Sequence, residues 1–322
     1  MPRFGLLLCL FLLGPAAAAN AQSWPARPIK LIVPTGAGAA TDVMARLMAD
    51  SVTHGLGQPV VVENQPGASG LIAHQSAARA APDGYTFLFT NTSGLATNLV
   101  TFKSLPYDPV KDFTAVATVV DFGPQMLSVN VDLPVKSTAE LIAYAKANPG
   151  KLSYAVDVTA GAAPFAARLF NKRGGLGMVE VPYKSAAQMV QDVASGNIPV
   201  LIASMAASNS MVQAGKIRQL ALTSTNRFPP LPDLPTINET VPGVTMDGWF
   251  VLVAPAGVPA EIVARMNREV GKFLKGDDIN KRLAGFGLAT SGAGTPQSTA
   301  DYITSEQARW RALAQELDIQ PQ

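Results

Sequence analysis

Apolar and polar positions along the chain alternate between two periods. Short runs of β-branched and aliphatic residues indicate strands, and apolar residues spaced by three or four positions indicate helices. In the first third, strands are predicted at 29–33, 59–63 and 85–89, and helices at 41–52 and 71–80. Strands that alternate with helices in this way predict an α/β fold.

The same alternation resumes near residue 125 and again near residue 249. Further strands are predicted at 126–129, 152–156, 179–181, 198–202, 219–223 and 249–253. Further helices are predicted at 137–147, 162–172, 185–195, 259–274 and 298–317. Ser137 and Glu140 have the spacing of a capping box, and the proline-rich stretch 229–235 is expected to be a rigid surface loop.

The first residues have the pattern of a secretory signal peptide. Arg3 precedes the apolar run 4–13, and Ala19-Asn20-Ala21 fits a small-residue cleavage site. Residues 1–21 are therefore expected to be removed on export. The mature chain then has no cysteine, because Cys9 lies inside the removed segment. No later stretch has eighteen uninterrupted apolar residues, so the exported mature chain is expected to be soluble, and we expect it to be a monomer.

Composition narrows the possible functions. Of the 322 residues, 48% are hydrophobic and 15% are charged, which suits two folded domains with sizeable cores. The 25 basic and 23 acidic residues give a net charge of +2 without any basic run, so no nucleic-acid partner is expected. The only histidines are His54 and His74, which leaves no zinc centre of the Cys/His kind. Neither has a nearby acid in a triad-like pattern, so both are expected to be surface or packing side chains. No catalytic residue, metal or cofactor is expected.

A loop rich in glycine and alanine joins the first predicted strand to the first predicted helix. Small residues let the backbone approach a ligand closely, and the helix N-terminus adds unpaired N–H groups that favour a carboxylate or phosphate. The candidate ligand contacts in this loop are Thr35, Gly36, Ala37, Gly38, Ala39, Thr41 and Asp42. A tight turn without a ligand explains the loop equally well. Asp42 and Arg46 are expected to pair as a helix-stabilising ion pair.

Three further segments place polar side chains after predicted strands, where ligands of open α/β sheets bind. Their candidate contacts are Asn91, Thr92, Ser93, Asp157, Val158, Thr159, Ala160, Gly161 and Ser204. Ordinary turn chemistry accounts for Asn91–Ser93 when that segment is taken alone.

Short motifs follow one another in a fixed order over essentially the whole mature chain. They are Trp24-Pro25 with Pro28-Ile29, Thr41-Asp42 with Ala45-Arg46, Gly57–Asn64 with Pro66–Ala68, Pro82–Thr86, Leu105–Pro109 with Lys111–Phe113, Val181–Lys184, Gly215–Arg218, Leu231–Thr236 and Ala254–Pro259. As an ordered set they resemble the Bug-type, TctC-like periplasmic receptors of tripartite tricarboxylate transport systems.

The resemblance implies a type II periplasmic-binding-protein fold with two α/β domains joined by two crossover segments. One domain would use residues 22–124 and 248–322, and the other 125–247. The cleft between them would hold a small organic carboxylate, with the loop 35–42 facing the loop 157–162. The resemblance also implies delivery of that ligand to integral-membrane permease subunits without any enzymatic step.

Three departures from the family's pattern bear on the ligand. Thr35 stands where an aromatic residue is common, and Pro199 and Ala203 stand where aspartates are common. A desolvated ammonium group needs an acidic partner. The absence of these two aspartates therefore favours a ligand that has no ammonium group, such as an aliphatic or aromatic mono- or dicarboxylate. Asp157 argues against this ligand class, because its carboxylate could pair with an amine or repel a second carboxylate.

Two other outputs remain open from the sequence. A receptor of this kind could present its ligand to a signalling partner instead of a permease. A secreted hydrolase would need a nucleophile beside His54 or His74.

Overall fold

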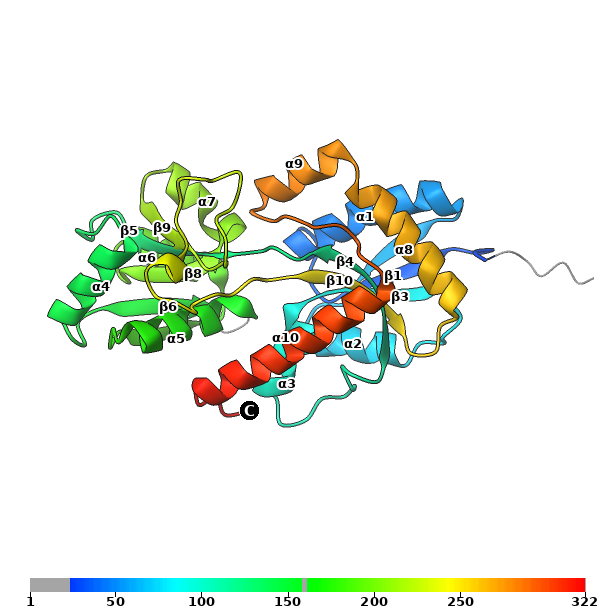
Figure 1. The fold of residues 1–322 in the computed structure, drawn as a ribbon, viewed down its shortest axis with the longest axis horizontal. Helices are drawn as coiled ribbons and strands as arrows, with labels where there is room; N and C mark the ends of the chain where they lie inside the picture. Colours follow the sequence, from blue (N-terminus) through cyan, green and yellow to red (C-terminus); the bar gives the residue numbers. More distant parts are fainter. Residues whose placement is uncertain (1–23, 158–160, 322) are drawn as a thin grey trace, which may run out of the picture.

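The computed structural model describes residues 24–157 and 161–321, which form two α/β domains side by side (Figure 1). The sheet of the first domain contains β1 (Ile29–Val33), β2 (Val60–Asn64), β3 (Thr86–Asn91), β4 (Phe113–Val120) and β10 (Phe250–Pro255). Its strand order is β2-β1-β3-β10-β4, with β10 antiparallel to both neighbours. From β10 onward, the chain therefore returns to the first domain.

The sheet of the second domain has the same arrangement. It contains β5 (Gln125–Asn130), β6 (Ser153–Asp157), β7 (Val179–Tyr183), β8 (Val200–Ser204) and β9 (Ile217–Leu222). Its order is β7-β6-β8-β5-β9, and here β5 is the strand antiparallel to both neighbours. In each domain the parallel strands carry the βα loops, so both sets of loops belong to corresponding positions of two similar sheets.

Helices cover both faces of each sheet. In the first domain, α1 (Ala40–Leu56) and α8 (Ala260–Leu274) pack on one face, with α9 (Asp277–Gly285) after them, and α2 (Leu71–Ala78), α3 (Asn98–Thr101) and α10 (Pro296–Glu316) lie on the other. In the second domain, α4 (Thr138–Ala147) and α5 (Ala162–Gly174) lie opposite α6 (Ala186–Ala194) and α7 (Met205–Gln213). The apolar stripe of α1 includes Met44, Met48 and Val52, and the helix ends at Gly57, whose φ of 71° is left-handed.

Two crossover segments join the domains, one between β4 and β5 and one before β10. They run antiparallel where they pass each other, and the Gly248 N–H donates to the Gly123 carbonyl at 2.8 Å. A Cβ on Gly123 would lie 2.6 Å from the Gly248 carbonyl oxygen, so glycine is required for this approach. Two adjacent crossovers of this kind suit a hinge.

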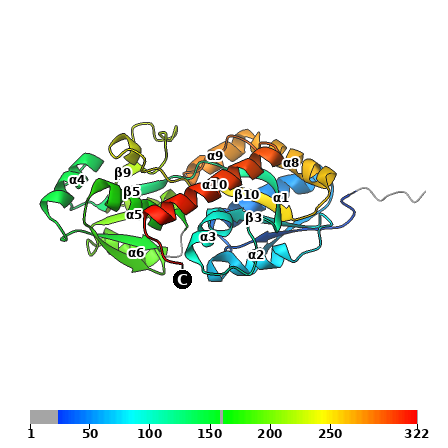
Figure 2. The ribbon, with the colours of Figure 1, turned by 60° about the horizontal axis from the view of Figure 1, so that its bottom comes forward.

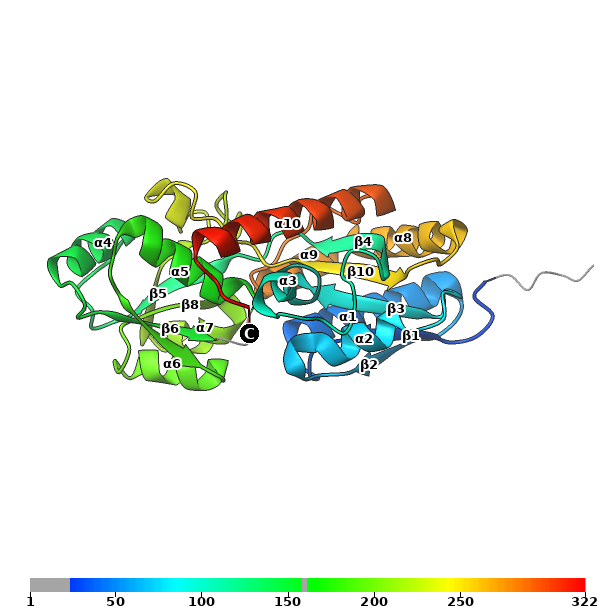
Figure 3. The same cartoon turned by 90° about the horizontal axis from the view of Figure 1, so that it is seen from below.

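The long helix α10 connects the domains a third time. It starts over the first sheet, where Thr299 and Thr118 share a hydrogen bond, and ends against α5 (Figures 2 and 3). There the Trp310 ring packs edge-on against Phe165 at 4.8 Å, and Arg173 makes two 2.8 Å hydrogen bonds to Glu316. Residues from both domains consequently belong to one buried cluster.

The predicted elements are present, with shifts of a few residues at their ends. Four elements, β4, α3, α7 and α9, were not predicted from the sequence. Ser204 was predicted to follow a strand, but it is the last residue of β8. The signal-peptide prediction concerns residues outside the described part of the chain. Among the described residues, no helix combines the length and the apolar character needed to cross a membrane.

Candidate functional site

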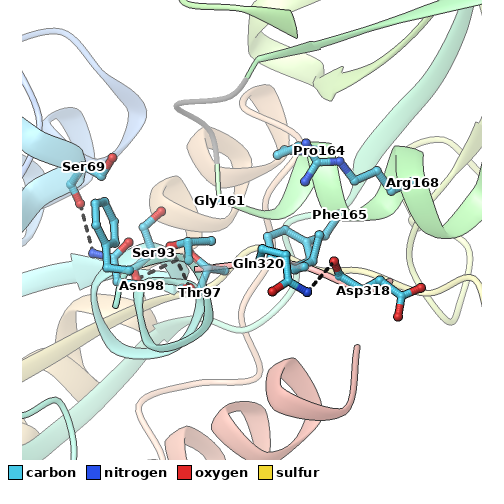
Figure 4. A pocket seen from close by; sticks show the side chains of 13 residues that line it. Ser69, Ser93, Thr97, Asn98, Gly161, Pro164, Phe165, Arg168, Asp318 and Gln320 are labelled. Carbon is cyan, nitrogen blue, oxygen red and sulfur yellow. Dashed lines mark hydrogen bonds between the residues drawn. The ribbon is translucent and has the colours of Figure 1, made fainter. Parts of the chain in front are cut away.

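A cavity of about 370 Å³ lies between the two domains (Figure 4). This volume is in the range of pockets that hold small molecules. Side chains from the turn η1 (Ala68–Gly70), the turn η2 (Ser93–Thr97), α3, α5 and the C-terminal tail line it. The described lining residues are Ser69, Ser93, Thr97, Asn98, Thr101, Phe102, Gly161, Pro164, Phe165, Arg168, Asp318, Ile319 and Gln320.

The wall contributed by the first domain is made mainly of hydroxyl and amide groups, together with the apolar side chains of Phe102 and Ile319. Ser69 is exposed, and the Ser69 carbonyl accepts a 3.2 Å hydrogen bond from Asn98 Nδ2. Ser93 lies two residues after the end of β3, and its N–H donates to Asn91 Oδ1 at 3.1 Å. Such groups can donate hydrogen bonds to an anion without carrying a charge themselves.

The wall contributed by the second domain begins at the N-terminus of α5. Gly161 is the residue before this helix, and a Cβ on it would lie 2.6 Å from Ser93 Oγ and 3.6 Å from Thr97 Oγ1. The two domains therefore touch at this point. Pro164 and Phe165 follow as buried apolar lining residues.

Arg168 is the cationic side chain among the described lining residues. Its guanidinium makes 2.6 and 2.8 Å hydrogen bonds to the Glu180 carboxylate, which also accepts from Tyr154. Burial favours a raised pKa for Glu180, but the hydrogen bonds from Arg168 and Tyr154 outweigh burial and lower it. Both side chains of the pair stay ionised. The positive charge of Arg168 at this end of the cavity is therefore neutralised by Glu180.

The first βα loop does not line this cavity. Gly36, Ala37 and Gly38 are exposed, but the Gly38 N–H already donates to Asp42 Oδ2 at 2.8 Å. The Thr35 carbonyl accepts from the Asn64 side chain at 3.0 Å. In this conformation the acid at the helix start satisfies the Gly38 N–H, and the role of Gly38 as a ligand donor stays a prediction.

Several expected side-chain contacts are buried away from the cavity. Thr41 and Asp42 are 4% and 2% exposed, and Asp42 forms the predicted ion pair with Arg46 at 3.0 Å. Thr92 is 4% exposed, and its N–H and Oγ1 bond the Trp249 carbonyl and N–H respectively. Thr92 therefore fastens β3 to the second crossover. Ala39 is the residue that precedes α1, and neither it nor exposed Ser204 is among the described lining residues.

The second predicted loop is described only at its two ends. Asp157 is the last residue of β6, and Gly161 lines the cavity. Val158, Thr159 and Ala160 lie outside the described residues. Of the contacts expected from the sequence, the structure brings Ser93 and Gly161 together at the cavity.

Both histidines have the packing or surface positions expected of them. His54 is exposed on α1, with Nδ1 2.8 Å from the Asp50 carbonyl. His74 is fully buried between the Gly70 carbonyl and the Thr90 hydroxyl. Its Nδ1 thus faces a peptide carbonyl where a Ser-His-Asp triad would have a carboxylate. Among the described residues, no group of three or more His, Cys, Asp or Glu side chains is arranged to hold a metal.

Most of the lining residues were not predicted from the sequence. Gly67-Ala68-Ser69-Gly70 was an available signal, because glycines flank a serine just after a predicted strand. Arg168 and Gln320 had no local signal, since only the packing of α5 and of the C-terminal tail brings them to the cavity.

Comparisons with known proteins agree with one another. The sequence profile of the tripartite tricarboxylate transporter family receptor matches residues 44–319. Protein BugT of Bordetella pertussis is 36% identical over 305 residues, covering 94% of this chain and 93% of BugT. The solved structure of R. palustris Rpa4515 with adipate has 39% identity and a TM-score of 0.83, covering 93% of this chain and 100% of that one. MatC (Rpa3494) from Rhodopseudomonas palustris with bound malate has 28% identity and a TM-score of 0.76, covering 90% and 99%.

Proposed function

Because this chain belongs to the family of tripartite tricarboxylate transporter receptors, we propose that it captures a small organic carboxylate between its domains and delivers it to integral-membrane permease subunits. The observation that carries the proposal is the interdomain cavity with its hydroxyl and amide lining. The ligand is bound and released without chemical change.

Carboxylate capture in this protein is a local property. The net charge of +2 supplies little long-range attraction, and the guanidinium of Arg168 is already paired with Glu180. Binding then depends on hydrogen bonds from groups such as the hydroxyls of Ser69 and Ser93, and on backbone N–H groups at the start of α5. Gly161 already lines the cavity, and the loop 35–42 joins it with the rest of the loop 157–162 when the crossovers let the domains close further.

The ligand class that fits best is an aliphatic or aromatic mono- or dicarboxylate without an ammonium group. Asp318 is the acidic side chain among the described lining residues, and it is 86% exposed. An exposed carboxylate is a weak partner for a desolvated ammonium. The adipate and malate bound by the two related structures are likewise acids without an amino group.

We further propose that the chain is exported and that its two domains move relative to each other. Residues 1–21 act as a cleaved signal peptide, and the mature chain works in the periplasm. Residues 22–124 with 248–322 form one domain and 125–247 the other. The crossovers at Gly123 and Gly248 form the hinge, and the ligand favours the closed state.

Isothermal titration of the mature protein tests the ligand class. We expect saturable binding of adipate-like, succinate-like or terephthalate-like acids, and no binding of glutamate under the same conditions. A rise in melting temperature with the same acids provides an independent readout, since a ligand that binds only the native state stabilises it. Tight binding of glutamate alone would disprove the proposed ligand class. Loss of uptake of the bound acid in a deletion strain tests delivery to a permease.

A further inference from the structure

His74 and Tyr107 form a stacked pair directly behind the cavity wall of the first domain. Their rings lie 5.0 Å apart at 22°, and both side chains are buried. Neither residue is among the described residues that line the cavity. The pair sits instead between the turn η1, which carries Ser69, and the turn η2, which starts with Ser93.

His74 joins η1 to the end of β3. Its Nδ1 lies 2.7 Å from the Gly70 carbonyl oxygen, and its Nε2 lies 2.7 Å from Thr90 Oγ1. A carbonyl oxygen can only accept, so Nδ1 carries the proton and Nε2 accepts from the Thr90 hydroxyl. Burial lowers the pKa of His74 to about 4, which keeps this neutral tautomer in place at neutral pH.

Tyr107 joins the same region to η2. Its hydroxyl donates to the Gly94 carbonyl at 2.6 Å and accepts from Asn98 Nδ2 at 3.3 Å. Asn98 Nδ2 also contacts the Ser69 carbonyl at 3.2 Å. One hydroxyl and one amide thus tie the two turns together.

The two turns have backbone conformations that need such support. Ala68 and Ser69 have φ angles of 48° and 53°, which cost energy for residues with a Cβ. The segment Ser93–Thr97 is a single π-helical turn, a conformation that is common at functional sites. The His74 ring leaves room only for glycine at position 94, because a Cβ there would lie 1.7 Å from His74 Nε2.

We propose that His74 and Tyr107 are positioning residues of the binding site, which hold η1 and η2 so that Ser69 and Ser93 face the ligand. This inference rests on the proposed function for what the site binds, and on the geometry above for how it is held. The pair acts through the turns and touches no ligand itself. Loss of the pair should therefore reduce the free energy of ligand binding more than it reduces the free energy of unfolding.

The Tyr107→Phe variant tests the inference, because it removes one hydroxyl and keeps the stacked ring. We expect adipate affinity to fall about tenfold, which corresponds to the loss of one well-placed buried hydrogen bond. Tyr183→Phe is the matched control, because its hydroxyl donates to Asp192 in the second domain, away from the cavity. The control should bind adipate as the wild type does.

A double-mutant cycle with Ser69→Ala separates positioning from general destabilisation. If Tyr107 acts through η1, the loss of adipate affinity in the double variant is smaller than the product of the two single losses. Losses that simply multiply would overturn the inference. Urea unfolding of each variant shows how much of the change belongs to the fold.

Amide hydrogen exchange provides a readout that needs no ligand. In Tyr107→Phe, peptides covering residues 68–70 and 93–97 should exchange faster than in the wild type, and in Tyr183→Phe they should not. If the wild type binds no carboxylate but this exchange rises, the proposed function fails and the positioning role stands. If the exchange is unchanged in Tyr107→Phe, the positioning role is overturned whether or not a ligand binds.

Discussion

The hydroxyl of Ser93 lies against the α-carbon of Gly161 where the two domains meet. A Cβ on Gly161 would stand 2.6 Å from Ser93 Oγ, closer than two such atoms can pack. The two residues come from β3–η2 of one domain and from the start of α5 of the other. Glycine at 161 therefore permits this closeness of the domains.

The Gly161→Ala variant should hold the domains apart and weaken carboxylate binding. Overpacking of this kind costs about 1–3 kcal/mol, and here the cost falls on the closed state that the ligand needs. Isothermal titration with adipate measures the loss. Ser93→Ala removes the opposing oxygen but also a proposed ligand donor, so it serves as its own reference. Gly161→Ala should weaken binding less in the Ser93→Ala background than in the wild type. Gly285→Ala, where a Cβ meets no atom within 4 Å, is the control. Unchanged affinity in Gly161→Ala would show that the contact does not limit closure.

Asp247, beside Gly248 in the second crossover, should make stability depend on pH. The pKa of Asp247 is raised from an ordinary 3.8 to about 7, chiefly because the carboxyl is buried. Arg309 opposes this rise, and the nearby carboxylates of Glu306 and Asp121 add to it. A raised pKa means that the folded state holds the proton more tightly than the unfolded state. The cost of ionising Asp247 is therefore absent below about pH 4 and fully expressed above about pH 7.

The Asp247→Asn variant should remove this dependence and be more stable than the wild type at about pH 8. The melting temperature between about pH 4 and pH 8 is the measurement. Asp233→Asn, at an exposed carboxylate in the loop after β9, serves as the control and should leave the profile unchanged. If the melting temperature of Asp247→Asn changes with pH as steeply as that of the wild type, the carboxylate of Asp247 does not cause the pH dependence.

The sequence predicted the local structure best where a single residue type decides it. Gly57 ends α1 in a left-handed conformation, and Ser137 caps α4 by accepting from the Glu140 N–H, as their patterns indicated. The ordered motifs also identified the family, which the profile match over residues 44–319 confirms.

The features that were not predicted from the sequence depend on strand pairing and packing between distant parts of the chain. The strand β4 was overlooked because its place depends on β10, about 130 residues later in the chain. Thr92 reads as a turn residue with a free hydroxyl, but the returning crossover places Trp249 against it. The cavity wall was equally hidden, since α5 and the C-terminal tail reach η2 only after both domains have folded.

The buried carboxylate of Asp42 should contribute more to the free energy of unfolding than a surface ion pair does. Burial favours a raised pKa, but hydrogen bonds from Arg46, Gly38 and Asn64 together hold the pKa of Asp42 below its ordinary value. A depressed pKa contributes stability that is present above about pH 4 and lost as the pH falls through the folded-state value. Asp42→Ala leaves three donors without their acceptor, which should cost about 1–3 kcal/mol at neutral pH.

Urea unfolding at about pH 7 and about pH 3 measures the effect of Asp42→Ala. The difference from the wild type should shrink at the lower pH, where the wild-type carboxylate begins to accept a proton. Asp50→Ala, at an exposed position of the same helix, should change little at either pH. A difference that stays constant across the range would point to lost packing instead of lost charge.

The attachment of α10 to the second domain should depend on Trp310 far more than on the Arg173–Glu316 ion pair. Trp310 is fully buried, packs against Phe165 and donates from Nε1 to Glu306 at 3.2 Å. Its truncation to alanine should cost about 3–5 kcal/mol, as for other large buried side chains. The side chains of Arg173 and Glu316 are each 32% exposed, so Arg173→Ala should cost at most about 1 kcal/mol. Urea unfolding of both variants, with Trp310→Phe as an intermediate case, gives the ranking. An equal loss in Trp310→Ala and Arg173→Ala would mean that charge, and not buried apolar area, fastens this helix across the two domains.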